Sequence, residues 1–151
     1  MSNVVRAEQL PANMEEMHGK MDRLEEAMRQ AGEIELPVKH FFAHGVYGRQ
    51  LFIPKGTVLT GKIHKYDNLN VMIQGELSVL TKEGVKRVKA PFTIVSPAGT
   101  RRVAYAHEDT IWMTVHGTFE QDLEKIEEYF IAQSYSEYLE FCKEQLCLGQ
   151  Q

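Results

Sequence analysis

The apolar residues of this chain follow three successive patterns, and the first is helical. Between residues 11 and 31, alternating intervals of three and four positions separate Met14, Met17, Met21, Leu24 and Met28. This spacing places all five side chains on one face of an α-helix. We predict a helix over residues 11–31, with Asn13 as its N-cap and Gly32 just beyond its end. The methionine face either packs on the rest of its own chain or contacts a neighbouring subunit.

The second pattern runs from Val38 to Gly117 and is typical of β-structure. Runs rich in Val, Ile, Leu, Thr and aromatic residues cover residues 46–53, 58–65, 69–81, 85–96 and 101–117. Glycine and proline turn signals separate them every 8 to 12 residues or so, as in β-sandwiches and barrels. Lys82-Glu83-Gly84, between two alternating runs, predicts a hairpin turn.

The third pattern, after Gly117, is helical again. Thr118 and Gln121 have the spacing of a capping box for a helix over residues 119–132, and Ser134 and Glu137 have the same spacing for a second helix. The chain therefore divides into an N-terminal helix and linker (1–37), a β-barrel (38–117) and a C-terminal helical extension (118–151). The fold class is mainly β, with one helix before the barrel and two after it.

Charge and composition exclude several classes of function. The net charge of −4 and the pI near 5.9 argue against nucleic acid as a partner, because phosphate binding requires a basic surface. No apolar run approaches the roughly 18 residues of a membrane span, and the N-terminus lacks the pattern of a signal peptide. Cys142 and Cys147 lie five positions apart in a predicted helix, too far for a disulfide. We expect a cytoplasmic protein with no membrane partner.

The spacing of residues around Gly56 resembles the first motif of the cupin superfamily. That motif reads Gly, five residues, His-x-His, three or four residues, Glu, six residues, Gly. Here Gly56 is followed at the same intervals by Lys62-Ile63-His64, Asn68 and Gly75. The glycines are retained, while two of the three ligand positions are changed.

The second cupin motif is retained in part. Pro97-Ala98-Gly99 matches its Pro-x-Gly, but Pro91 replaces its first glycine, Arg102 replaces its histidine and Ala106 replaces its asparagine. The resemblance implies a small cupin-type β-barrel, a double-stranded β-helix, over about 80 residues. The chain also resembles uncharacterised cupin-like proteins of tailed phages, which implies a location in the host cytoplasm or in the virion. The stretches that carry this second resemblance are His64-Lys65, Leu69-Asn70, residues 90–93, residues 108–112 and residues 122–127.

The residues at the motif positions suit an anion better than a metal. Lys62 and Arg102 carry positive charge and have no lone pair to give a cation. We therefore expect no metal cofactor, and a metal at His64 is the less favoured alternative. Strand alternation places Lys62, His64, Asn68 and Asn70 on one face, which the motif alignment turns toward the barrel interior.

With Arg102 opposite and His116 at the mouth, these residues predict a site for a carboxylate, a phosphate or a nucleotide. The alternative is that Lys62 and Arg102 point into solvent or pair with an acid such as Glu108. In that case side chains of the protein fill the barrel.

These features support more than one function. We expect first a non-metal cupin-fold protein that binds a small anion or serves as a homo-oligomeric assembly module. One alternative is a metal-independent isomerase, epimerase or lyase in which His64 is the general base. The other is a phage structural protein, with the helices as its contact surfaces.

Overall fold

The structure is a computed structural model that describes residues 10–32, 34–81 and 84–149. Helix α1 (Leu10–Ala31) precedes the strands. The strands of the first half are β1 (Val38–Ala43), β2 (Val46–Ile53), β3 (Val58–Thr60), β4 (Ile63–His64) and β5 (Asn68–Gln74). Those of the second half are β6 (Glu76–Thr81), β7 (Gly84–Lys89), β8 (Phe92–Ser96), β9 (Val103–Ala106) and β10 (Thr110–Gly117). The C-terminal segment holds α2 (Leu123–Phe130), β11 (Ile131–Ala132) and α3 (Tyr135–Leu148).

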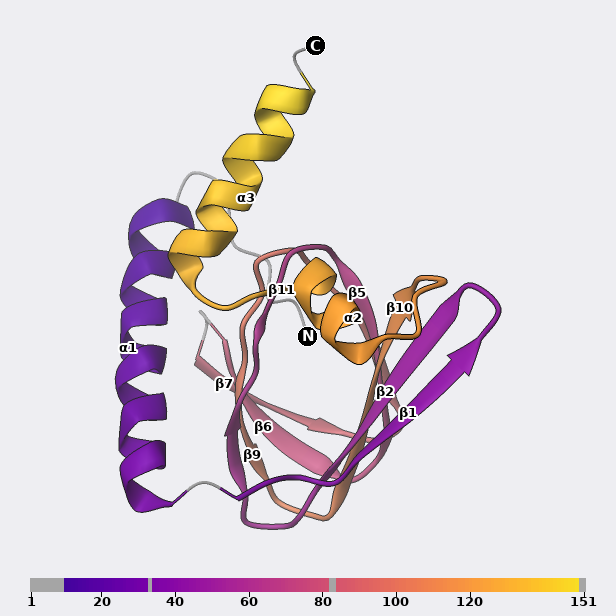
Figure 1. Ribbon diagram of the computed structural model, residues 1–151. Coiled ribbons are helices and arrows are strands. Elements are labelled where there is room, and N and C mark those ends of the chain that lie inside the picture. The colour runs from indigo at the N-terminus through magenta and orange to yellow at the C-terminus, as the bar shows by residue number, and fades with distance from the viewer. Residues whose placement is uncertain (1–9, 33, 82–83, 150–151) are drawn as a thin grey trace.

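Two antiparallel sheets form the barrel. The larger has the strand order β1-β2-β10-β5-β8 and the smaller the order β3-β9-β6-β7, while β4 pairs with β11. Apart from the hairpins β1–β2 and β6–β7, neighbouring strands come from distant parts of the chain, and the sheets wind around a common interior (Figure 1). The chain is mainly β, a double-stranded β-helix with one helix before the barrel and two after it. This confirms the predicted fold class.

The hydrophobic core lies between the two sheets at one end of the barrel. Ile53 and Met72 of the larger sheet pack with Val79 and Leu77 of the smaller sheet, and all four are at most 3% exposed. Each such side chain contributes roughly 1.5–3 kcal/mol to stability by leaving water. The core leaves the other end of the barrel open to polar residues.

The motif glycines occupy turns that require left-handed backbone. Gly56, Gly75 and Gly99 have φ values of +83°, +101° and +81°, a region that side chains disfavour. At Gly75 a Cβ atom would lie 2.2 Å from Oγ1 of Thr110. The retained spacing of these glycines therefore reflects the geometry of the barrel corners.

Helix α1 packs along the barrel beside α3 (Figure 1). Arg101, whose side chain is 7% exposed, forms ion pairs with Asp22 and Glu25 of the helix. Met21 is 2% exposed in the single chain, which favours packing of the methionine face on its own chain. The helix begins at Leu10, so Asn13 lies inside its first turn and the predicted N-cap is wrong.

Of the two capping boxes predicted for the C-terminal helices, one is present in the structure and the other is not. Ser134 does cap α3, and its Oγ accepts a hydrogen bond from the backbone N–H of Glu137 at 3.1 Å. Helix α2 instead begins after Asp122, whose carboxylate accepts backbone N–H groups from the first turn. The predicted box at Thr118 is wrong because its hydroxyl accepts the N–H of Glu120 within a loop.

Two further features concern the rest of the chain. The predicted hairpin joins β6 to β7, but Lys82 and Glu83 of its turn lie outside the described residues. None of the helices in the described part of the chain is long and apolar enough to cross a membrane.

Candidate functional site

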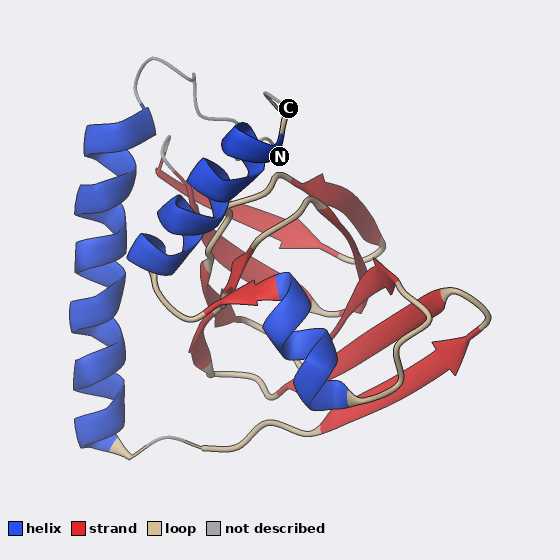
Figure 2. Ribbon diagram, turned by 45° about the horizontal axis from the view of Figure 1, so that its top comes forward, coloured by secondary structure: helices blue, strands red, loops and turns tan. Residues whose placement is uncertain are grey.

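A cavity of about 640 Å³ lies inside the barrel. Both sheets line it, and helix α2 lies across one end of the barrel and contributes Ile126, Glu127 and Phe130 to the lining (Figure 2). This volume is within the range of pockets that hold small organic ligands. The cavity is therefore the candidate site.

The cavity wall changes from polar to apolar along the strands of the larger sheet. Cross-strand partners share a face of a sheet, so the register defines rows of side chains. Near α2 one row pairs Tyr47 with His116, and Asn68 with Ser96. The next row brings together His40, Arg49, Thr114 and Asn70. Deeper in the barrel follow Leu51, Trp112 and Met72.

The smaller sheet contributes an apolar wall opposite these rows. Leu59, Leu77, Val79 and Ala104 line the cavity from this side. The cavity therefore has a polar end beneath α2 and an apolar floor.

Asn70 is the centre of a buried hydrogen-bond network. Its Nδ2 donates to Oδ1 of Asn68 at 2.7 Å and to Oγ of Ser96 at 2.8 Å. Its Oδ1 accepts from Nε1 of Trp112 at 3.0 Å and from Oγ1 of Thr114 at 2.8 Å. An amide has two donor and two acceptor positions, and protein groups occupy all four. Asn70 therefore fixes the positions of its neighbours on the cavity wall.

Arg102 places a guanidinium in this wall. Its Nη2 donates to Oγ of Ser96 at 2.6 Å, and its Cζ lies 5.6 Å from the centroid of the Trp112 ring. Burial lowers the pKa of Arg102 to about 10, which still leaves the guanidinium protonated at neutral pH. Ser96 accepts from both Arg102 and Asn70, so its hydroxyl proton can be donated to a third group.

Two imidazoles stack on each other at the end of the polar rows that lies nearest α2. The rings of His64 and His116 lie 5.6 Å apart at an angle of 20°, and Phe130 of α2 lies 4.3 Å from His116. Burial lowers the pKa of both histidines to about 4, and the positive charge of Arg49 acts in the same direction on both. The charges of His116 and Arg102 further lower the pKa of His64. Both imidazoles are therefore neutral at pH 7. The ring of His64 also hydrogen-bonds the backbone of Lys62, which favours its protonated form.

Three cavity residues come from β1 and β2 and were missed from the sequence. Nδ1 of His40 lies 2.8 Å from the hydroxyl of Tyr47, and the Tyr47 ring stacks on His116 at 6.1 Å. Arg49 adds a second guanidinium to the lining. The alternation of Tyr47, Arg49, Leu51 and Ile53 along β2 was the signal that could have grouped Tyr47 with Arg49.

The predicted residues are brought together in one region, with one exception in orientation. His64, Asn68, Asn70, Arg102 and His116 all line the cavity. Lys62 lies at its rim, and its ammonium forms an ion pair with Glu127 of α2 while its side chain stays 60% exposed. For Lys62 the structure thus agrees with the alternative of pairing with an acid, although the acid is Glu127 and not Glu108.

The residues at the cupin ligand positions do not fit a divalent metal. Lys62 and Arg102 are cations, and Oδ1 of Asn68 already accepts a hydrogen bond from Asn70. The rings of His64 and His116 are stacked, whereas a metal binds imidazoles in their ring planes. Among the described residues, no group of three or more His, Cys, Asp or Glu side chains could hold a metal ion.

Comparisons with known proteins find similar solved structures only. No protein-family model and no curated protein matches the sequence. Among solved structures, KdgF from a Halomonas species is similar over 60% of this chain and 87% of its own, with 20% identity and a TM-score of 0.48. An RmlC-like cupin from Shewanella frigidimarina is similar over 60% and 84%, with 17% identity and a TM-score of 0.47. A Klebsiella pneumoniae protein with a double-stranded β-helix domain is similar over 56% and 73%, with 16% identity and a TM-score of 0.48.

These likenesses concern the fold alone. The resemblance to phage proteins stays a prediction.

Proposed function

We propose that the barrel binds a small organic anion with an apolar body, such as a medium-chain carboxylate or an alkyl or aryl phosphate. The observation that supports this most is the guanidinium of Arg102, which Ser96 holds at the polar end of the cavity, next to its apolar floor. A cation that burial has partly stripped of water gains strongly from an anionic partner with charge-assisted hydrogen bonds. We assign the ligand headgroup to Arg102 and the Ser96 hydroxyl.

The rest of the cavity suits the remainder of such a ligand. Neutral imidazoles of His64 and His116 can each donate or accept a hydrogen bond beside the headgroup. Below them, Leu51, Leu59 and Val79 offer an apolar surface to a hydrocarbon chain or ring. Pockets that bind small molecules usually combine a largely apolar wall with a few placed polar groups.

Catalysis by His64 gains no support from this arrangement. A general base works best with a pKa near the operating pH, whereas the pKa of His64 is lowered to about 4. The group that hydrogen-bonds its ring is a backbone carbonyl of Lys62, which cannot relay a proton as an acid would. Binding without turnover is therefore the function that the site supports best.

Differential scanning fluorimetry tests the proposal with probes that differ in charge or in apolar body. Octanoate and octyl phosphate should raise the melting temperature, whereas octanol, which lacks the charge, and acetate, which lacks the apolar body, should not. A nucleoside monophosphate distinguishes nucleotide binding from binding of simpler anions.

The variants Arg102→Gln and Lys62→Gln provide the matched comparison, because both remove one cation near the cavity. Arg102→Gln should weaken octanoate binding on the order of 10- to 100-fold, the effect of losing one charged hydrogen bond. Lys62→Gln should bind like the wild type. An equal response to octanol and octanoate, or wild-type affinity in a folded Arg102→Gln protein, would refute the proposal.

A further inference from the structure

The outer face of the larger sheet is apolar across all five strands. One continuous row consists of cross-strand partners in the order Phe41, Gly48, Val115, Leu69 and Val95. Of these, Phe41, Leu69 and Val95 are 49%, 40% and 58% exposed. Ile73 and Val46 of the same face are 49% and 43% exposed. Cross-strand partners point to the same side, so these side chains form one surface.

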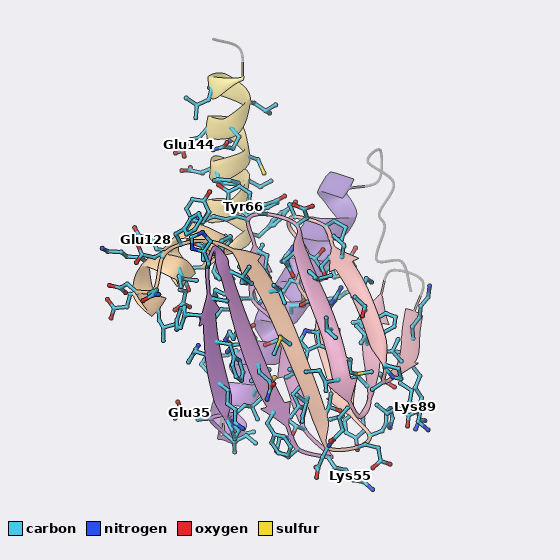
Figure 3. All side chains as sticks on the ribbon, turned by 90° about the vertical axis from the view of Figure 1, so that its right-hand side faces the viewer. Glu35, Lys55, Tyr66, Lys89, Glu128 and Glu144 are labelled. Carbon is cyan, nitrogen blue, oxygen red and sulfur yellow. The ribbon has the colours of Figure 1, made fainter. Side chains whose placement is uncertain are left out.

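The neighbouring rows add to this surface with little charge. Next to the first row, Lys39, Gln50, Met113, Val71 and Thr93 are cross-strand partners. The structure describes all residues of these five strands, and among their outward-facing positions Lys39 is the one charged residue. Figure 3 looks directly onto this face, and none of the described helices crosses it.

The outer face of the smaller sheet provides an internal comparison, because charged residues stand there among exposed apolar ones such as Leu80 and Val85. Glu76 pairs with Lys89 across β6 and β7, Ser78 pairs with Arg87, and Glu76 forms an ion pair with Arg87. An antiparallel sheet with one face in water shows this alternation, whereas strands covered on both faces are apolar on both. The larger sheet has the composition of a sheet that is covered on both faces.

We propose that a second copy of the chain covers this face, giving a symmetric dimer of two larger sheets packed against each other. A two-fold axis that runs along the central strand β10 places β1 of one copy over β8 of the other, and β2 over β5. Phe41 then faces Val95, and Gly48, which has no side chain, faces Leu69. Large side chains thus meet smaller ones in both halves of the interface, as a self-complementary contact requires.

The size of the face is near the lower limit for a stable contact. Five strands about 4.8 Å apart, each about 20 Å long, give a projected area on the order of 400–500 Å², and the accessible area of side chains standing on it is larger. Specific interfaces begin at about 600 Å² of accessible surface per partner, with a core depleted in charge. A lipid surface is a poorer occupant, because interfacial binding relies on basic residues around an apolar face and this face holds Lys39 alone.

Sedimentation equilibrium of the full chain, over a range of concentrations, tests the dimer with two matched variants. Leu69→Lys changes a leucine on the outer face of the larger sheet, and the control Leu80→Lys changes one on the outer face of the smaller sheet. The two leucines are 40% and 43% exposed. The wild type should have twice the chain mass of 17.3 kDa, and so should Leu80→Lys. A lysine near the centre of the interface should raise the dissociation constant of Leu69→Lys by at least about 30-fold.

A monomeric wild type, or a dimer that Leu69→Lys leaves intact, would overturn the inference. A monomer that binds liposomes or another protein would do so as well. Circular dichroism shows whether each variant is folded. If Leu69→Lys is unfolded, the pair Val95→Lys and Val85→Lys decides in the same way, since these valines lie on the outer edge strands β8 and β7 and are 58% and 69% exposed. The dimer does not depend on the ligand proposal.

Discussion

Acidification should destabilise this protein through the two stacked histidines of the cavity. Burial lowers the pKa of His64 and of His116 from 6.5 to about 4 in the folded state. Below pH 6.5 the unfolded chain takes up protons that the folded chain does not bind. Linkage then requires the free energy of unfolding to fall as the pH drops below 6.5. The contribution of these two histidines to that fall ends near pH 4, where the folded chain also binds the protons.

The magnitude follows from the two pKa values. A difference between 6.5 and about 4 corresponds to about 3 kcal/mol for one histidine, of which about 2 kcal/mol is already lost at pH 5. The two losses are not independent, because the charge of His116 contributes to the lowered pKa of His64. We therefore expect the pair to remove about 5 kcal/mol between pH 7 and pH 4, a large part of the stability of a typical domain.

Urea unfolding at pH 7, 6 and 5 measures this loss, and a variant separates it from the titration of carboxylates. His116→Phe keeps a ring beside Phe130 but carries no ionisable group, so its unfolding free energy should fall about half as steeply with acid as that of the wild type. His44→Phe makes the same change at an exposed histidine and should keep the wild-type slope. Equal slopes for wild type and His116→Phe would refute the reasoning.

Three further substitutions should change stability by different amounts, each measured by urea unfolding at pH 7. Asn70→Leu should cost about 3–5 kcal/mol, because it leaves the indole N–H of Trp112 and other buried groups without their partner; a cost below 1 kcal/mol would contradict the network. Gly75→Ala should cost more than about 3 kcal/mol, since its φ is +101° and the added Cβ would meet Thr110; wild-type stability would disprove that turn. Lys62→Ala should cost less than about 1 kcal/mol, as is usual for an exposed ion pair, and a larger loss would show that the pair with Glu127 holds α2 in place.

Local patterns allowed the barrel to be predicted because its corners depend on local chemistry. The spacing of Gly56, Gly75 and Gly99 persists, since each adopts positive φ at a turn. Strand alternation likewise predicted a common face for His64, Asn68 and Asn70, and all three line the cavity. Both features follow from a few neighbouring residues.

The missed features depend on contacts between distant segments. Lys62 pairs with Glu127, which lies 65 positions away in the sequence. Glu127 belongs to α2, and the capping box predicted at Thr118 placed the start of that helix wrongly. Arg49 and Tyr47 alternate with outward residues in β2, but alternation alone does not say which side of the strand faces the cavity. His18 carried no signal in the sequence, yet it is 2% exposed and stacks on Tyr135 of α3 at 4.2 Å.

The central claim, that the barrel holds an organic anion by its charged headgroup, is tested most directly by a crystal structure with 8-bromooctanoate, whose bromine can be located by anomalous scattering. We predict the carboxylate within hydrogen-bond distance of Arg102 and Ser96, and the bromine among Leu51, Leu59 and Val79. A probe that binds only outside the barrel, or one whose carboxylate lies away from Arg102, would contradict the account.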